Sequence, residues 1–164
     1  MTFDELYKQN YEAIYKFCFR FLNNREKARD VVQDTFLKLY QQMDKGGYQI
    51  ENPGSWLYKV AGNNCLNLLN MANRQKEINH QMEIRHTEKS NPESQFISNE
   101  NAMRVRKAIR SLSPQHQMLV LMYQDGLSYK EMSEATAIPV NSIGKTLWRN
   151  IQKISHMIKK DEHV

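Results

Sequence analysis

The apolar side chains of this 164-residue chain recur every three or four residues in two blocks, with a polar segment between them. That spacing is the period of an amphipathic helix. Residues 76–98 break the pattern, because Glu, Ser, Asn, Gln and His predominate there. Such a segment buries too little surface to offset the entropy lost on ordering. The sequence therefore predicts an all-α fold with two small helical domains, 1–75 and 99–164, joined by a flexible polar linker at 76–98.

Composition argues against several other kinds of protein. Six Gly and four Pro leave little material for the turns of a β protein. No stretch reaches the ~20 apolar residues of a membrane span, and the first residues lack the pattern of a secretion signal. Cys18 and Cys65 lie among apolar neighbours and form no Cys-x-x-Cys pair, which favours buried free thiols. We therefore expect a cytoplasmic protein that does not insert into membranes.

Local start signals place three helices in the first block. Thr2 and Glu5 have the spacing of a capping box. Asn23 and Asn24 interrupt the first helix and can cap the second. Pro53 suits the first position of a third helix, because its missing N–H costs nothing there.

The second block ends in the outline of a helix-turn-helix motif. Ser128 and Glu131 have the spacing of another capping box, at the start of a short helix that reaches about Ala135. A tight connection leads to Pro139, after which a long final helix begins. Its apolar face is predicted to consist of Ile143, Leu147, Ile151, Ile154 and Ile158. A short capped helix, a tight turn and a longer helix are typical of a DNA-binding helix pair.

The polar side of the final helix carries residues that suit a DNA reader. In helix-turn-helix proteins the N-terminal turns of the second helix face base edges in the major groove. The polar and basic residues at these turns are Asn141, Ser142, Lys145, Thr146 and Arg149. Between residues 135 and 160 there are five basic residues and no acidic one, so binding to a duplex would release counterions. The alternative is an ordinary solvated helix face.

Catalytic and metal-binding patterns are not found in the sequence. The five His residues are scattered and have no metal-ligand spacing with Cys or carboxylates. There is no Gly-rich phosphate loop, no Gly-x-Ser-x-Gly elbow and no His-Glu-x-x-His motif. We therefore expect neither an enzyme nor a protein that requires a metal or cofactor.

The second helix is expected to present a partner-binding surface. Its apolar stripe is predicted to be core, which leaves Asp30, Gln33, Asp34 and Leu37 on the outside. An exposed Leu among acids and an amide is a modest indication of a partner surface. Single exposed Leu residues are also common, so an ordinary surface is the alternative.

The third helix is rich in Asn, a poor helix former, with five of them in eleven positions: Asn63, Asn64, Asn67, Asn70 and Asn73. Asn side chains can bond base edges, and aromatic rings can stack on unpaired bases. Together with Trp56, Tyr58 and Lys59, and with the loop around Tyr48, this helix could hold single-stranded nucleic acid. A polar solvated face with Trp56 in the core is the alternative.

Three sequence motifs occur in a fixed order along the chain. They are Asp30-Val31-Val32-Gln33-Asp34-Thr35-Phe36, then Pro53-x-x-Trp56-Leu57-Tyr58-Lys59, and then Gly126-Leu127-Ser128-Tyr129-x-Glu131-Met132. With these motifs in register over nearly its whole length, the chain resembles the extracytoplasmic-function group of bacterial sigma factors. The resemblance implies a transcription initiation factor, monomeric when free, that binds core RNA polymerase and directs it to promoter DNA.

The resemblance also implies a role for each surface. The polymerase-binding residues would be Asp30, Gln33, Asp34 and Leu37. The residues that hold the melted minus-ten strand would be Tyr48, Trp56, Lys59, Asn63 and Asn67, and the final helix would read the minus-thirty-five element as duplex. Members of the group are commonly held inactive by an anti-sigma factor that covers such surfaces. The linker would let the two domains rearrange between free, inhibited and polymerase-bound states.

The chain departs from the group in the reading helix, where Ser142-Ile143-Gly144 stands at positions that usually include a basic residue. Gly inside a helix costs about 1 kcal/mol relative to Ala. Gly144 therefore indicates either a close approach of the backbone to DNA or a helix that is locally less stable.

Two other function classes fit the same residues. A stand-alone helix-turn-helix repressor or activator, dimerising through residues 1–75, would bind its duplex tightly without polymerase. An adaptor or inhibitor protein would show no salt-dependent DNA binding at all.

Overall fold

The computed structural model describes residues 1–46, 49–79 and 100–162. Within them the chain forms seven helices and no strand, which confirms the predicted all-α class. The helices are α1 (Phe3–Leu22), α2 (Arg25–Asp44), α3 (Pro53–Asn79), α4 (Glu100–Arg110), α5 (Pro114–Gln124), α6 (Tyr129–Thr136) and α7 (Val140–Glu162). Because α3 continues through Asn79, residues 76–79 of the predicted linker are helical. The remainder of that linker lies outside the described residues.

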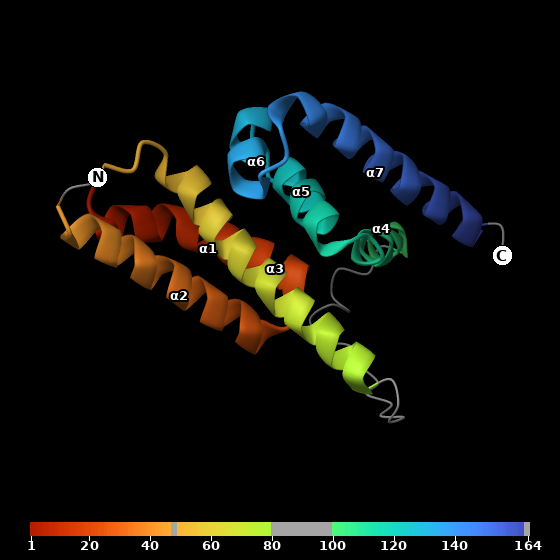
Figure 1. Cartoon of the computed structure of the whole chain (residues 1–164), viewed down its shortest axis with the longest axis horizontal. Coiled ribbons are helices and arrows are strands. Elements are labelled where there is room, and N and C mark those ends of the chain that lie inside the picture. The colour runs from red at the N-terminus through yellow and green to blue at the C-terminus, as the bar shows by residue number, and fades with distance from the viewer. Residues whose placement is uncertain (47–48, 80–99, 163–164) are drawn as a thin grey trace.

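The first half of the molecule is a helical hairpin with a third helix packed on it. α1 and α2 lie side by side, and α3 contacts both (Figure 1). The buried side chains of these helices include Ile14, Phe17, Cys18, Val32, Phe36, Leu39, Leu57, Ala61 and Cys65. Both cysteines are free and buried, as the sequence predicted.

The boundaries of the first two helices follow from the side chains that cap them. Thr2 Oγ1 accepts from the N–H of Glu5 at 3.3 Å, and Glu5 Oε2 accepts from the N–H of Thr2 at 3.0 Å, which confirms the capping box. Asn23 ends α1 in the left-handed conformation with φ 51°. Asn24 then caps α2 by accepting from the N–H of Lys27 at 3.0 Å. Two consecutive asparagines thus end one helix and begin the next.

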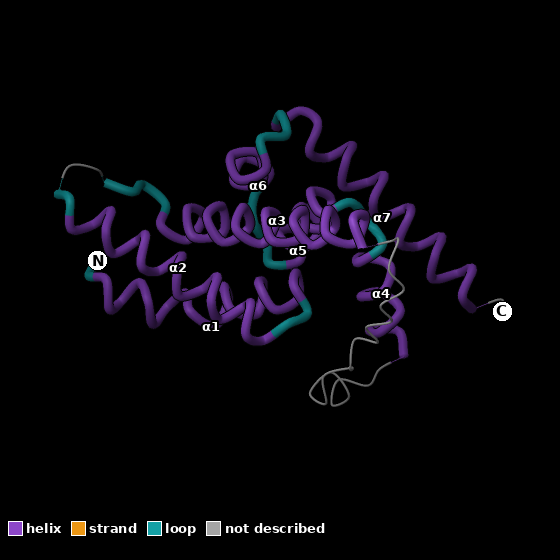
Figure 2. Tube along the Cα trace, turned by 60° about the horizontal axis from the view of Figure 1, so that its bottom comes forward, coloured by secondary structure: helices purple, strands orange, loops and turns teal. Residues whose placement is uncertain are grey.

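The second half contains the predicted helix-turn-helix. Ser128 Oγ caps α6 by accepting from the N–H of Glu131 at 3.1 Å. Ala137 then takes the left-handed conformation with φ 61°, and Ser133 Oγ donates to the carbonyl of Ile138 at 2.6 Å. These contacts lie in the turn between α6 and α7, which pack against each other (Figure 2). α7 also packs against α4 and α5.

The buried face of α7 differs from the prediction at one position. Ile143, Leu147 and Ile154 are buried, but Ile151 is 39% exposed, and the buried residue at that level is Asn150. At about 100° per residue, Asn150 lies about 20° from Ile143 around the helix axis, whereas Ile151 lies about 80° away. The helical period therefore directs a polar residue, rather than the isoleucine, into the core.

The two halves pack against each other. α5 contacts both α1 and α3, and α6 contacts α3 (Figure 1). As a result, the buried side chains of both halves belong to one continuous core. The sequence indicated two helical units, and it did not indicate that they would share a core.

Candidate nucleic-acid and polymerase surfaces

The reading residues predicted on α7 lie along its outward face, and together they are called the α7 surface. Asn141, Lys145 and Arg149 are exposed and follow one another at intervals of four, so they share a strip of the helix. Ser142 and Thr146 are half-buried beside that strip, and Thr146 Oγ1 donates to the carbonyl of Ser142 at 2.8 Å. The three exposed side chains are therefore free of the core, while the Thr146 hydroxyl is engaged within the helix.

Gly144 faces an aromatic ring inside the helix-turn-helix. An ideal Cβ at this position would lie 3.4 Å from Cε2 of Tyr129, which starts α6. Tyr129 is exposed, so its ring lies over the junction between the two helices rather than in the core. At that distance a Cβ would make an ordinary van der Waals contact, so packing against Tyr129 does not require a glycine at this position. The expectation that Gly144 lets the backbone approach DNA stays a prediction.

Three residues predicted to hold unpaired DNA form an exposed row on α3, here called the α3 surface. Lys59, Asn63 and Asn67 follow one another at intervals of four, and all are exposed. Trp56 is half-buried and packs against the core, so part of its ring remains accessible. Tyr48 lies outside the described residues.

Tyr58 does not belong to the α3 surface, although its aromatic ring suggested a stacking role. The side chain is buried, and its hydroxyl donates to Asp125 Oδ2 at 2.9 Å. Burial, reinforced by the Asp125 carboxylate, raises the pKa of the Tyr58 hydroxyl well above its usual range. The hydroxyl therefore stays protonated, as a fixed hydrogen-bond donor inside the molecule.

The residues predicted to bind polymerase form the α2 surface. Asp30, Gln33, Asp34 and Leu37 are all exposed, and Leu37 keeps 54% of its accessible area. Asp34 Oδ2 accepts from Lys38 Nζ at 2.9 Å and from Asn64 Nδ2 at 2.9 Å. Exposed ion pairs of this kind contribute little to stability, so a partner can displace them at low cost. The Asn64 bond places the α2 surface directly beside α3.

Sequence reasoning missed two exposed aromatic residues. Tyr40 is 53% exposed and lies three residues after Leu37, so the two side chains extend the same apolar patch on α2. Its ring meets Phe3 edge to face, with centroids 5.3 Å apart. Trp148 is 64% exposed on α7, next to Arg149. The available signals were the i, i+3 spacing of Leu37 and Tyr40 and, for Trp148, a position about 140° around the helix axis from Ile143.

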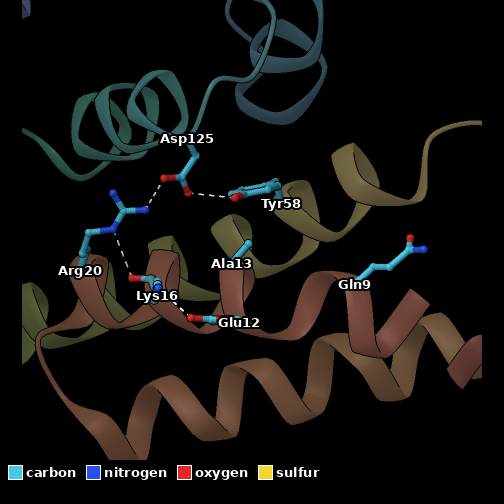
Figure 3. A pocket seen from close by; sticks show the side chains of 7 residues that line it. All are labelled: Gln9, Glu12, Ala13, Lys16, Arg20, Tyr58 and Asp125. Atoms are coloured by element: carbon cyan, nitrogen blue, oxygen red, sulfur yellow. Dashed lines mark hydrogen bonds and ion pairs between the residues drawn. The ribbon is translucent and has the colours of Figure 1, made fainter. Parts of the chain in front are cut away.

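A cluster that joins the two halves was also missed, because its members are far apart in the sequence. Arg20 on α1 forms an ion pair with Asp125, which follows α5, and Asp125 also accepts from Tyr58 on α3 (Figure 3). These side chains line a cleft of about 410 Å³ between the halves.

The described residues hold neither a metal-binding cluster nor a membrane-spanning helix. No group of three or more His, Cys, Asp or Glu residues in the described ranges could hold a metal ion. None of the helices in those ranges is long and apolar enough to cross a membrane.

Comparisons with known proteins identify both halves. Residues 6–75 match the family profile "Sigma-70 region 2", and residues 102–150 match "Sigma-70, region 4". The first segment spans α1 to α3 with the α2 and α3 surfaces, and the second spans the helix-turn-helix with the α7 surface. The two matches occur in the order that the sequence motifs indicated.

Similar proteins are RNA polymerase sigma factors. The chain is 22% identical over 162 residues to the sigma factor SigE of Mycolicibacterium smegmatis, covering 97% of this chain and 62% of that protein. It is 28% identical to sigma factor YlaC of Bacillus subtilis, covering 90% and 87%, and 26% identical to SigW of the same organism, covering 94% and 86%.

A solved structure shares the fold. The sigma factor RpoE of Bartonella quintana, crystallised with the anti-sigma factor NepR, superimposes with a TM-score of 0.72 at 18% identity, covering 96% of each chain. Two family profiles in order, relatives along nearly the whole chain and a common fold lead to one conclusion. This chain belongs to the extracytoplasmic-function group of RNA polymerase sigma factors.

Proposed function

We propose that this chain binds core RNA polymerase and directs it to specific promoters. The α2 surface contacts polymerase, the α3 surface holds the melted minus-ten strand, and the α7 surface reads the minus-thirty-five element as duplex. The observation that carries the proposal is the location of these three surfaces on three different helices. Each presents exposed side chains, and each lies within a segment that matches sigma region 2 or region 4.

The mechanism is recruitment followed by trapping of unpaired bases. Cationic residues of the α7 surface gain binding free energy by releasing counterions from duplex phosphates. On α3, amide side chains and the accessible part of Trp56 offset part of the cost of extruding bases, which is a few kcal/mol for each base. Bond formation between nucleotides belongs to polymerase, so the chain itself is not an enzyme and needs no cofactor. It acts in the cytoplasm and is monomeric when free.

Regulation by an inhibitor is part of the proposal. The similar structure from Bartonella quintana contains the anti-sigma factor NepR. An inhibitor of this kind would compete with polymerase or DNA for the surfaces that this chain exposes. Sigma-factor relatives along most of the chain argue against a stand-alone repressor or activator.

Run-off transcription tests the proposal directly. Purified core polymerase is incubated with genomic fragments, with and without the chain, and the transcripts are sequenced. We expect discrete start sites that depend on the chain. An absence of chain-dependent starts, together with no binding to core polymerase at low salt, would overturn the proposal.

The polymerase contact is tested by reversing a charge on the α2 surface. Asp34→Arg should reduce binding to core polymerase at least tenfold, because the variant removes a carboxylate from the proposed contact and adds a like-charge clash with Lys38. Asp44→Arg, at the exposed end of the same helix, is the matched control and should bind as the parent chain does. Equal binding by both variants in a co-purification assay would remove Asp34 from the contact.

A further inference from the structure

α7 carries an exposed row of residues whose middle member has no side chain. Val140, Gly144 and Trp148 follow one another at intervals of four, so they lie along one side of the helix. Val140 is 48% exposed and Trp148 is 64% exposed. The row therefore presents a valine, then bare backbone, then an indole ring.

Tyr129, at the start of α6, borders the bare position. α6 packs against α7 (Figure 1). An ideal Cβ on Gly144 would lie 3.4 Å from Cε2 of Tyr129 and 3.9 Å from its hydroxyl oxygen, and Tyr129 is itself 48% exposed. Side chains of a helix lean toward its N-terminus, which directs the Trp148 indole over the turn that contains Gly144. Gly144 and the three side chains around it, Tyr129, Val140 and Trp148, are here called the apolar notch.

The apolar notch adjoins the α7 surface. At about 100° per residue, Trp148 lies about 20° from Asn141 around the helix axis and about 60° from Lys145. Lys145 and Arg149 are exposed beside it, and no acidic residue occurs between residues 135 and 160. A cationic border of this kind attracts the phosphates of a duplex. The charge around the notch therefore favours DNA as its partner.

The chemistry of the notch suits a methyl group. In the major groove every base pair presents hydrogen-bond donors or acceptors, and thymine adds its C5 methyl group. The valine side chain and the two aromatic rings offer mostly carbon surface, and apolar side chains of this kind make the contacts that identify thymine. A long basic side chain at position 144 would instead cover the gap and offer donors to guanine.

We propose that the apolar notch takes the methyl group of a thymine in the minus-thirty-five element and so selects a T·A pair at one position. The proposal rests on the function proposed above, because it gives a base preference to the α7 surface. The cationic residues position the duplex through its phosphates, and the notch supplies sequence information. Gly144 contributes by leaving the space that the methyl group fills.

Selection from random duplexes identifies the position. Holoenzyme is formed from core polymerase and the full-length chain and is bound to promoter duplexes whose minus-thirty-five element is randomised. The bound duplexes are then sequenced. We expect thymine to predominate at one fixed position of one strand. A selected element without such a thymine would overturn the proposal.

Deoxyuridine then isolates the contribution of the methyl group. It lacks only the C5 methyl group of thymidine and keeps the same base-pairing edge. Replacing the selected thymidine by deoxyuridine should weaken holoenzyme binding about fourfold, which is the factor expected for the loss of one buried methyl group. Replacing thymidines outside the selected position should change the affinity little. Fluorescence anisotropy of labelled duplexes provides the measurement.

Variants of the chain assign that methyl effect to the notch. Trp148→Ala removes one wall and should bring the ratio of thymidine to deoxyuridine affinity close to one, whereas Trp148→Phe keeps an aromatic wall and should retain most of it. Gly144→Arg fills the notch and should abolish the ratio while favouring a G·C pair at the same position. Gln152→Ala, exposed one turn further along α7, is the matched control and should keep the parent ratio.

The outcomes separate the notch from the sigma function. A ratio of one at every thymine, in a holoenzyme that initiates transcription, would overturn the notch and leave the sigma function intact; the exposed row would then face a protein. A parent ratio that persists in both Trp148→Ala and Gly144→Arg would also overturn it, because the methyl group would be read elsewhere. A chain that never binds core polymerase would refute the proposed function, and the notch with it.

Discussion

Asn150 is the residue whose burial is least expected from its chemistry. Its Nδ2 donates to the carbonyl of Thr146 at 2.8 Å, but its Oδ1 is buried and has no hydrogen-bond partner among the described residues. A buried acceptor without a partner costs about 1–3 kcal/mol. The buried face of α7 therefore includes a polar group without a hydrogen-bond partner, at the level where the sequence pattern predicted Ile151.

Replacing Asn150 should stabilise the chain. In Asn150→Leu, an apolar side chain with the same branching takes the place of the amide, and we expect the free energy of unfolding to rise by about 1 kcal/mol. The measurement is urea unfolding followed by circular dichroism. Gln152→Leu, at an exposed position of the same helix, is the control and should give no gain. A loss of stability in Asn150→Leu would mean that Oδ1 has a partner in solution.

Gly144 and Gly126 should respond in opposite directions to the same substitution. Gly144 is helical, and a Cβ there makes an ordinary contact with Tyr129, so Gly144→Ala should stabilise α7 by up to about 1 kcal/mol. Gly126 has φ +83°, so Gly126→Ala should destabilise the chain even though the space around it is open. Thermal unfolding of both variants provides the measurement, and a destabilised Gly144→Ala would indicate that the Tyr129 ring cannot move aside.

At the scale of single elements, local patterns predicted most of the structure. Capping side chains placed the starts of α1, α2 and α6, since a cap acts on backbone groups only two or three residues away. Periodicity then identified the buried stripes. The α2, α3 and α7 surfaces lie on the sides of these helices that the buried stripes leave exposed. Their binding roles stay predictions.

The residues that sequence reasoning misplaced make contacts that no local pattern encodes. Tyr58 meets Asp125 across 67 positions of the chain, and Arg20 meets it across 105. The sequence alone favours a place for Tyr58 on the nucleic-acid surface, because aromatic rings on a polar helix suit stacking. Only the packing of α5 and α6 against α3 shows that its face of the helix is covered.

The α7 surface predicts a specific salt effect. If Arg149 meets a phosphate, Arg149→Ala should weaken binding of promoter duplex and lower the slope of log affinity against log salt by about one unit. Lys159→Ala, exposed at the far end of the same helix, is the control and should leave the slope unchanged. The measurement is fluorescence anisotropy of a labelled duplex with holoenzyme over a salt series. Equal slopes for Arg149→Ala and the parent chain would contradict the phosphate contact.

At the scale of the whole molecule, the protonation of His116 makes the free energy of unfolding depend on pH. Burial, and secondarily the charge of Lys153 on α7, lower the pKa of His116 below its ordinary value. The unfolded chain therefore binds a proton more readily than the folded chain does. The contribution of neutral His116 to the free energy of unfolding is fully present above the ordinary His pKa of about 6.5. It is lost as pH falls from there through the lowered pKa of His116 in the folded chain.

Substituting His116 should remove that pH dependence. We expect His116→Gln to lose less stability than the parent chain between pH 7.5 and pH 5.5, as measured by urea unfolding. His156→Gln, at an exposed position of α7, is the control and should follow the parent chain. An identical loss for His116→Gln and the parent would place the titration elsewhere.

The arrangement of the two halves was the part of the fold that the sequence could not supply. Hydrophobic period and composition separate the helical blocks. The contact between the blocks depends on Gly62 of α3, where an added Cβ would lie 2.5 Å from Cε of Met118 on α5. It also depends on the hydrogen bonds that join Arg20, Tyr58 and Asp125. In its local sequence, each of these residues is an ordinary helix or loop residue. Their meeting is determined by tertiary packing alone.

The two tryptophans of the chain lie one in each half, in contrasting surroundings. Trp56 is half-buried against the core of the first half, whereas Trp148 projects from α7 with 64% of its area exposed. Intrinsic fluorescence should therefore have two components, one from Trp56 that iodide quenches weakly and a red-shifted one from Trp148 that iodide quenches strongly. Each half carries its own optical probe, and the order in which the halves unfold or meet a ligand can be followed without any dye.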